Sequence, residues 1–274
     1  MATIISRTEA FYVMKYSKPA IFIGIVITLC LQFACAEADA IEPERPSVSS
    51  ETISTSLTQS EALFKQRDDI AKLREAITVL RKARDPRQRN FEVEWKFARL
   101  NYFLGTQSTD EKEANKAFEE ARDAGKIAST LEPQKADGHF WYGASLGELS
   151  RKNMLTVGLK SIDLVRGAMQ KVVEIQPNYQ NTSAYDVLGQ IELETRLYGG
   201  KAEKAVELLE KGLENEKDNM NLHLHLAEAY LAIRKEGEAR KQLDKVLSMK
   251  HNPDFLIECR EAVEKAKKLL ATKF

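Results

Sequence analysis

Apolar residues recur at intervals of three and four positions along most of the chain after residue 56. This spacing places them on one face of an α-helix, and that face is buried against a neighbouring helix. Ala114, Phe118 and Ala121 illustrate the pattern. The runs predict five helix pairs, at about 57–84, 91–131, 136–175, 182–213 and 222–249, followed by a closing helix at about 253–270. No segment shows the alternation of a half-buried strand, so the predicted fold class is all-α.

Prolines mark the boundaries between these segments. Pro86, Pro133, Pro177 and Pro253 are separated by intervals of 47, 44 and 76 residues. The last interval is close to two periods, so we predict a turn without proline near Lys217. A helical period in the forties is typical of stacked helix pairs. We therefore predict an α-solenoid over residues 57–252 and a capping helix over residues 253–274, an architecture that usually presents a binding surface.

The N-terminal region has a different pattern. Residues 20–34 are apolar and uncharged and follow Lys15 and Lys18. At about 15 residues, the stretch is shorter than the ~20 that a spanning helix needs, but it suits the apolar region of a secretory signal. Small residues follow at Ala34-Cys35-Ala36. We predict that residues 1–36 are a signal peptide or a membrane anchor, and a start at Met14 would give a well-proportioned signal.

Cys35 offers a second interpretation, in which its thiol is lipidated and it becomes the mature N-terminus. Ala34 suits this interpretation, whereas Gln32 stands where a bacterial lipobox usually has leucine. Residues 37–56 are polar and aperiodic, with two prolines, and are predicted to form a flexible tether. Cleavage, lipidation and an uncleaved anchor all remain open. Each places the helical part outside the cytoplasm, in the periplasm or anchored to the envelope, with only the N-terminus touching the membrane.

Composition narrows the classes of partner. The chain is 43% hydrophobic and 30% charged, with 41 Lys and Arg against 41 Asp and Glu. Because neither a net positive charge nor a basic run is present, we predict no nucleic-acid binding. Removal of the signal would leave Cys259 as the last cysteine, so no intramolecular disulfide could form. We expect Cys259 to face inward on the closing helix.

One catalytic motif occurs in the chain. Residues 143–147 read Gly-Ala-Ser-Leu-Gly, the pattern of a serine hydrolase nucleophile elbow. That chemistry needs a strand, a sharp turn and a helix around the serine. Ser145 instead lies inside a predicted repeat helix, where small residues allow close helix packing. We therefore predict a packing role and no catalytic residue.

Metal and phosphate sites are not predicted either. His223 and His225 are two positions apart, which places them on different faces of a helix. His225 and Glu228 could chelate a metal, but without a third ligand we interpret them as a solvated pair. Gly200-Lys201 lacks the other residues of a phosphate loop. No metal and no cofactor are expected.

Binding is the remaining chemistry. The first helices of the pairs line the inner, concave side of a helix-pair stack. Trp141 and Tyr142 are expected in the core, since aromatic residues at helical spacing usually pack there. A mixture of one aromatic residue and several carboxylates would suit a small polar ligand or a basic segment of a partner. The alternative is a solvated inner face. The predicted inward residues are Lys96, Phe140, Glu148, Asp186, Gln190, Glu194 and Glu228.

The fifth pair resembles the tetratricopeptide repeat. His223, Leu226, Ala227 and Tyr230 have the spacing of its first helix, and Ala239 follows at the position of its second. The third and fourth pairs need extra residues in their inner turns. The resemblance implies an α-solenoid that binds protein partners.

Longer motifs are similar to a particular group of such proteins. The run from Gly138 to Ala144, the segment from Ile175 to Tyr179 and the turn Tyr198-Gly199-Gly200-Lys201 resemble the T-component of bacterial tripartite periplasmic (TRAP) transporters. The eukaryotic regulator-of-microtubule-dynamics proteins share the same helical core. The resemblance covers about residues 57–250. It implies a periplasmic, often lipid-anchored protein that associates with a substrate-binding protein and can form homo-oligomers with a central pore.

Two functional hypotheses follow. The first is a non-enzymatic scaffold or transporter accessory protein of the cell envelope. The second is a module that binds a small molecule, or forms a pore for it, during solute uptake.

Overall fold

The computed structural model describes residues 47–152, 159–252 and 255–274. The predicted signal peptide or anchor, with Met14 and Cys35, and the first part of the tether lie outside these residues. Within the described ranges, no helix combines the length and the apolar character needed to cross a membrane.

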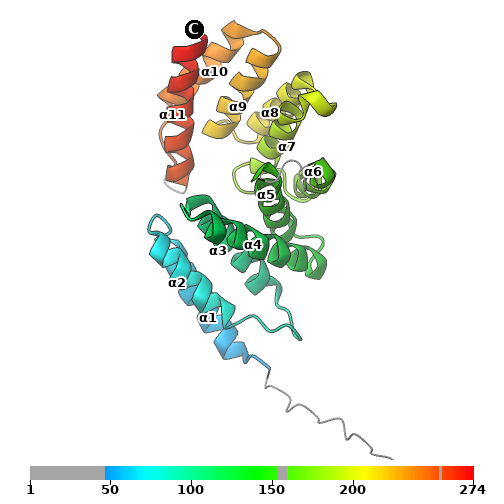
Figure 1. The fold of residues 1–274 in the computed structure, drawn as a ribbon, viewed down its shortest axis with the longest axis vertical. Helices are drawn as coiled ribbons and strands as arrows, with labels where there is room; N and C mark the ends of the chain where they lie inside the picture. The colour runs from blue at the N-terminus through cyan, green and yellow to red at the C-terminus, as the bar shows by residue number, and fades with distance from the viewer. Residues whose placement is uncertain (1–46, 153–158, 253–254) are drawn as a thin grey trace, which may run out of the picture. The chain divides into compact units, whose positions relative to one another are not determined.

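The described residues form helices and contain no strand, which confirms the predicted all-α fold (Figure 1). Five pairs and a closing helix follow one another near the predicted boundaries. The elements are α1 (Ser50–Phe64), α2 (Ile70–Arg81), α3 (Phe91–Gln107), α4 (Glu111–Leu131), α5 (Ala136–Lys152), α6 (Leu159–Ile175), α7 (Ser183–Glu194), the short 3-10 helix η2 (Arg196–Tyr198), α8 (Ala202–Asn215), α9 (Met220–Ala232), α10 (Glu236–Ser248) and α11 (Leu256–Lys273).

The first helix begins earlier than predicted. Residues up to 56 were expected to belong to the tether, but α1 starts at Ser50. The side chain of Ser49 accepts a hydrogen bond from the backbone N–H of Thr52, and Ile53 packs against the core. A helix N-cap therefore lies within the Ser/Thr-rich stretch that suggested a flexible chain.

Polar side chains cap several of the other helices. Asn90 accepts a hydrogen bond from the N–H of Val93 at the start of α3, and Asp110 accepts from Lys112 and Glu113 at the start of α4. These caps satisfy backbone groups that have no partner inside the helix.

Each helix packs against the next along the chain, and α11 packs against both α9 and α10. Three of the four successive pairs of first helices also touch, namely α1 with α3, α3 with α5, and α7 with α9. These contacts form an inner layer of first helices, and this layer positions the site described below.

The contact between α4 and α5 depends on two glycines. A Cβ atom at Gly138 would lie 2.3 Å from the backbone nitrogen of Ser129, and one at Gly125 would lie 2.5 Å from that of Tyr142. Any larger residue would force the two helices apart. This close approach gives a physical reason for the glycine that opens the run from Gly138 to Ala144.

Trp141 lies at the centre of the aromatic part of the core. Its side chain is 2% exposed, and its ring contacts those of Tyr102, Phe103 and Phe140 at centroid distances of 5.5, 6.0 and 5.0 Å. Tyr142 packs, partly buried, against the same cluster. The expected core positions of both residues are confirmed. Cys259 is also buried, as expected.

Candidate functional site

A cavity of about 400 Å³ lies among α3, α5, α7, α9 and the N-terminal half of α11. The inner layer supplies most of its walls. Of the seven residues predicted to point inward, five line this cavity. They are Phe140, Glu148, Asp186, Gln190 and Glu194.

Two of the predicted residues lie elsewhere. Lys96 does not line the cavity, because its Nζ atom is 3.2 Å from Glu61 Oε2 on α1 and 4.3 Å from the centre of the Trp95 ring. Glu228 is not among the lining residues either, although it lies on α9 close enough to act on the charge of His225. Among the described residues, the cavity is therefore lined by the second to fifth pairs and α11, and not by the first pair.

Apolar side chains form part of the wall. Phe140 and Val165 are contributed by α5 and α6, Val187 by α7, and Phe255 by the segment just before α11. Phe140 also contacts the ring of Tyr179 in the core at 5.3 Å. These side chains offer surfaces on which the apolar part of a ligand could be buried.

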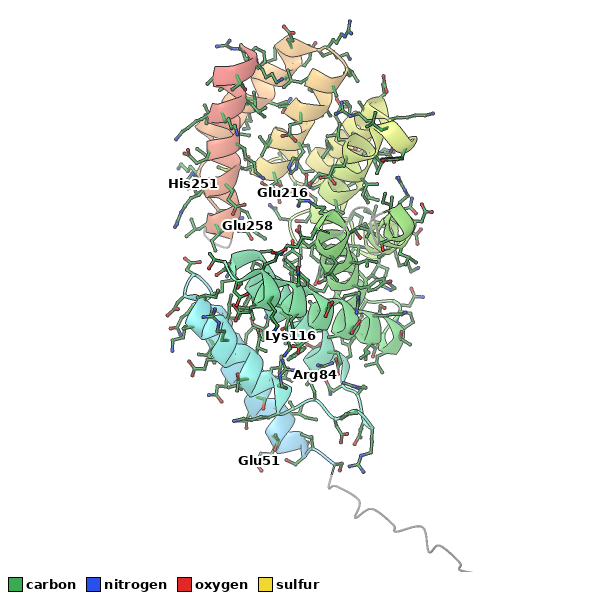
Figure 2. All side chains as sticks on the ribbon, viewed as in Figure 1. Glu51, Arg84, Lys116, Glu216, His251 and Glu258 are labelled. Atoms are coloured by element: carbon green, nitrogen blue, oxygen red, sulfur yellow. The ribbon has the colours of Figure 1, made fainter. Side chains whose placement is uncertain are left out.

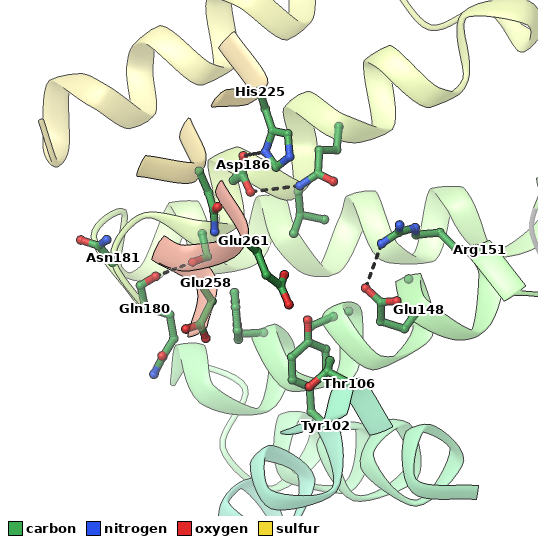
Figure 3. A pocket seen from close by; sticks show the side chains of 18 of the residues that line it. Tyr102, Thr106, Glu148, Arg151, Gln180, Asn181, Asp186, His225, Glu258 and Glu261 are labelled. Carbon is green, nitrogen blue, oxygen red and sulfur yellow. Dashed lines mark hydrogen bonds and ion pairs between the residues drawn. The ribbon is translucent and has the colours of Figure 1, made fainter. Parts of the chain in front are cut away.

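Arg151 connects two carboxylates on neighbouring first helices. One of its guanidinium nitrogens, Nη1, is 3.2 Å from Glu148 Oε1, and its Nε atom is 3.9 Å from Glu194 Oε1. Figure 3 shows the Arg151–Glu148 pair at one side of the cavity. The arginine is more than half exposed, so we expect the pair to add little stability.

Asp186 and His225 form a largely buried pair on the opposite side (Figure 3). The Nδ1 atom of His225 is 2.6 Å from Asp186 Oδ1, and Gln190 donates a hydrogen bond of 3.0 Å to the other oxygen of Asp186. The two partners belong to α7 and α9, the first helices of successive pairs. The interpretation of His225 and Glu228 as a solvated pair is therefore wrong, because His225 turns toward the preceding pair, where only 12% of its side chain stays exposed.

Electrostatics favour the charged form of His225. Its burial acts to lower its pKa, but the Asp186 carboxylate and the hydrogen bond to it, with a smaller contribution from Glu228, raise the pKa above the usual value. Lys265 on α11 opposes this effect.

This pair should make stability depend on pH. Since the pKa of His225 is raised in the folded state, its contribution is fully present below the unfolded value of about 6.5 and is lost as pH rises through the raised value. We expect the melting temperature of the protein to fall with rising pH in this window, and the His225→Gln variant to lack that component. His139→Gln, at a partly exposed histidine whose ring contacts the backbone oxygen of Pro133, is the matched control. An unchanged pH dependence in His225→Gln would contradict the assignment.

Sequence reasoning missed the contribution of α11. Glu258 and Glu261 lie one helical turn apart near its N-terminal end and line the cavity. Figure 2 labels Glu258 at this end of the helix. The sequence does give an indication of this acidic site, since the two glutamates lie on a helix that is otherwise rich in lysine. Their position over the cavity follows only from the packing of α11 on α9 and α10.

Tyr102 contributes a hydroxyl to the floor of the cavity. Figure 3 shows this hydroxyl and the Glu261 carboxylate both pointing into the open space between the helices. Burial is the main reason that the pKa of Tyr102 is raised, and the carboxylates of Glu148, Glu258 and Asp186 add to it. The phenol therefore remains protonated and can donate a hydrogen bond to a ligand.

The serine motif has none of the geometry of a nucleophile elbow. Ser145 lies within α5 and is 0% exposed, which agrees with a packing role. His223 contacts Gln242 and the backbone oxygen of Lys217, away from His225. Among the described residues, no group of three His, Cys, Asp or Glu side chains is arranged to hold a metal.

Comparison with known proteins agrees with this architecture. Residues 197–256 match the tetratricopeptide repeat family, and residues 56–191 match the family described as regulator of microtubule dynamics protein 1-3. No curated protein sequence matches the chain significantly. The chain is a tetratricopeptide-like helical repeat protein. Its residues 56–191 are similar to the regulator family, whose helical core the sequence was expected to share.

Solved structures with the same fold include two from bacteria. A thermophilic tetratricopeptide protein from Thermus thermophilus has 20% identity and a TM-score of 0.55, over 77% of this chain and 98% of that one. MamA from Desulfovibrio magneticus, from residue 41 to its end, has 16% identity and a TM-score of 0.52, over 73% and 96% of the two chains. At these identities the likeness concerns the fold alone.

Proposed function

We propose that this protein is a non-enzymatic scaffold that binds a partner protein in the cavity formed by its inner helices. The observation that carries the proposal is the convergence of α3, α5, α7, α9 and α11 on one cavity. Tetratricopeptide-like arrays generally bind protein partners, and the first helices of their repeats form the binding face.

We further propose that the protein acts in the cell envelope as an accessory factor like the T-component of TRAP transporters. The apolar stretch at residues 20–34 and the turn at Tyr198-Gly199-Gly200 support this role. Gly199 has a φ of +105°, a conformation that glycine adopts readily. The expected partner is then a periplasmic substrate-binding protein, with the N-terminus as membrane anchor or lipid attachment site and with homo-oligomers as the assembled form.

The second candidate is a module that binds a small molecule, or forms a pore for it, during solute uptake. The observation that favours it is the size of the cavity. A volume of about 400 Å³ falls within the range of small-molecule sites.

Affinity capture with a cavity-blocked variant tests the scaffold. Gly147 lines the cavity, and a Cβ atom there would meet only Val165, at 3.9 Å, so Gly147→Trp should fill the cavity. Gly237→Trp, on α10 where a Cβ would meet nothing within 4 Å, is the matched control. We expect the wild type and the Gly237→Trp variant to capture a protein from an envelope extract, and the Gly147→Trp variant to fail to capture it.

Equal capture by all three proteins would contradict a partner site in the cavity. Native mass spectrometry of the purified wild type gives the second readout. A small molecule bound at one copy per chain, without a protein partner, would favour the ligand-binding module.

A further inference from the structure

The lining of the cavity has an excess of negative charge. Six carboxylates line it, against two fixed cations, Arg151 and Lys265, and one histidine. The acidic residues come from α5, α7, α11 and the turn before α9. They are Glu148, Asp186, Glu194, Asp218, Glu258 and Glu261.

Three of these six carboxylates are paired with a basic side chain of the protein itself. Arg151 lies between Glu148 and Glu194, and His225 pairs with Asp186. In the described part of the chain, no lysine or arginine forms an ion pair with the other three, which include Glu258 and Glu261. The α11 side of the cavity therefore has two carboxylates, Glu258 and Glu261, against one lining cation, Lys265, and keeps an excess of negative charge.

The pKa values of two groups that line the cavity, Tyr102 and Glu258, show the effect of this negative charge. Carboxylates on three helices act together on the Tyr102 hydroxyl, and Arg151 is the cation that opposes them. The pKa of Glu258 is raised by its own burial, and the neighbouring charges of Glu261 and Asp68 add to this while Arg67 reduces it. Burial thus disfavours the charged form of Glu258, and a cation placed beside the carboxylate would favour it.

The rest of the wall decides which kind of cation fits. Phe140, Val187 and Phe255 offer apolar surface beside the carboxylates. A small inorganic cation would make no use of that surface, and an anion would be repelled. A positive charge at the end of an aliphatic stem would use both parts of the wall, as the side chains of lysine and arginine do.

We propose that the cavity binds a short basic segment of the partner protein, with one lysine or arginine side chain directed toward Glu258 and Glu261. The aliphatic stem packs against Phe140 and Val187, and the Tyr102 hydroxyl and the carboxylates surround the charged end. This assignment rests on the proposed scaffold function and names the chemistry of its partner.

The test measures binding of a fluorescent peptide in which lysine alternates with alanine, by anisotropy with the full chain. Its control is the same peptide with norleucine, a neutral residue of similar shape, in place of lysine. The protein variant is the double substitution Glu258→Gln and Glu261→Gln, which breaks no ion pair among the described residues. The matched control is Glu203→Gln with Glu214→Gln, on the exposed side of α8.

We expect the wild type and the α8 variant to bind the lysine peptide equally, and the α11 variant to bind it at least tenfold more weakly. The wild type should bind the norleucine peptide no more tightly than the α11 variant binds the lysine peptide. Affinity of the wild type should also fall as pH is lowered through the raised pKa of Glu258, because the protonated acid no longer attracts the cation.

Equal affinity of the α11 variant and the wild type, or equal affinity of the two peptides, would overturn the proposal. Tight binding of spermidine without binding of the lysine peptide would also overturn it, since the cation would then be a free amine. The scaffold function has a separate outcome. If Gly147→Trp abolishes partner capture and the α11 variant does not, the cavity binds a partner whose segment is not basic.

Discussion

Replacement of Glu94 by alanine is expected to lower the free energy of unfolding by about 3 kcal/mol. Glu94 is 0% exposed in the first turn of α3. It accepts hydrogen bonds of 2.8 Å from Arg84 and from Arg89, both in the connection between α2 and α3. Its removal would leave two partly buried guanidinium groups without their carboxylate. The expected loss lies at the low end for a buried pair because both arginines keep some contact with water.

Urea unfolding followed by circular dichroism measures this loss, and Glu120→Ala is the matched control. Glu120 pairs with Arg81 at 2.6 Å between the same two helix pairs, but here the carboxylate side chain is 23% exposed and the arginine 49%. An exposed pair contributes about 0–1 kcal/mol, so the control should change stability little. Equal losses in the two variants would show that burial does not determine the effect. Figure 2 labels Arg84, which lies beyond the end of α2.

The helix pairs could be predicted from the sequence because the information is local. Spacing of three and four residues identifies a buried helix face, and the prolines mark the turns between pairs. α3 and α4 begin and end at the residues where the periodic pattern begins and ends, from Phe91 to Leu131. Counting along the first helices also places Phe140 and Glu148 toward the cavity.

The parts that could not be predicted depend on contacts between distant segments. His225 pairs with Asp186 across 39 positions, and neither residue has a local neighbour that reveals the other. α11 places Glu258 in the cavity only because it packs back on α9 and α10. Lys96 was misplaced for the same reason, since Glu61 on α1 attracts it away from the cavity side.

A second large effect on stability is expected from replacement of Trp141, the tryptophan that lines the cavity. Trp141→Ala is expected to lower the free energy of unfolding by about 3–5 kcal/mol, because it removes a large side chain from the core. Trp141 contacts three aromatic rings and is 2% exposed. Because it also lines the cavity, its loss should join the new void to the existing space and weaken any ligand held against Phe140.

Trp95→Ala is the matched control, since Trp95 is the other tryptophan and is only partly buried. Its indole donates to Glu92 on the helix surface, so truncation should cost well under half as much as at Trp141. Urea unfolding of both variants gives the comparison, and Trp141→Phe should recover much of the loss because it refills the same space. If Trp95→Ala proved the more damaging change, the aromatic cluster around Trp141 would not be the main support of the cavity. The expected order, Trp141→Ala, then Trp141→Phe, then Trp95→Ala, follows from the volume each change leaves empty in the buried interior.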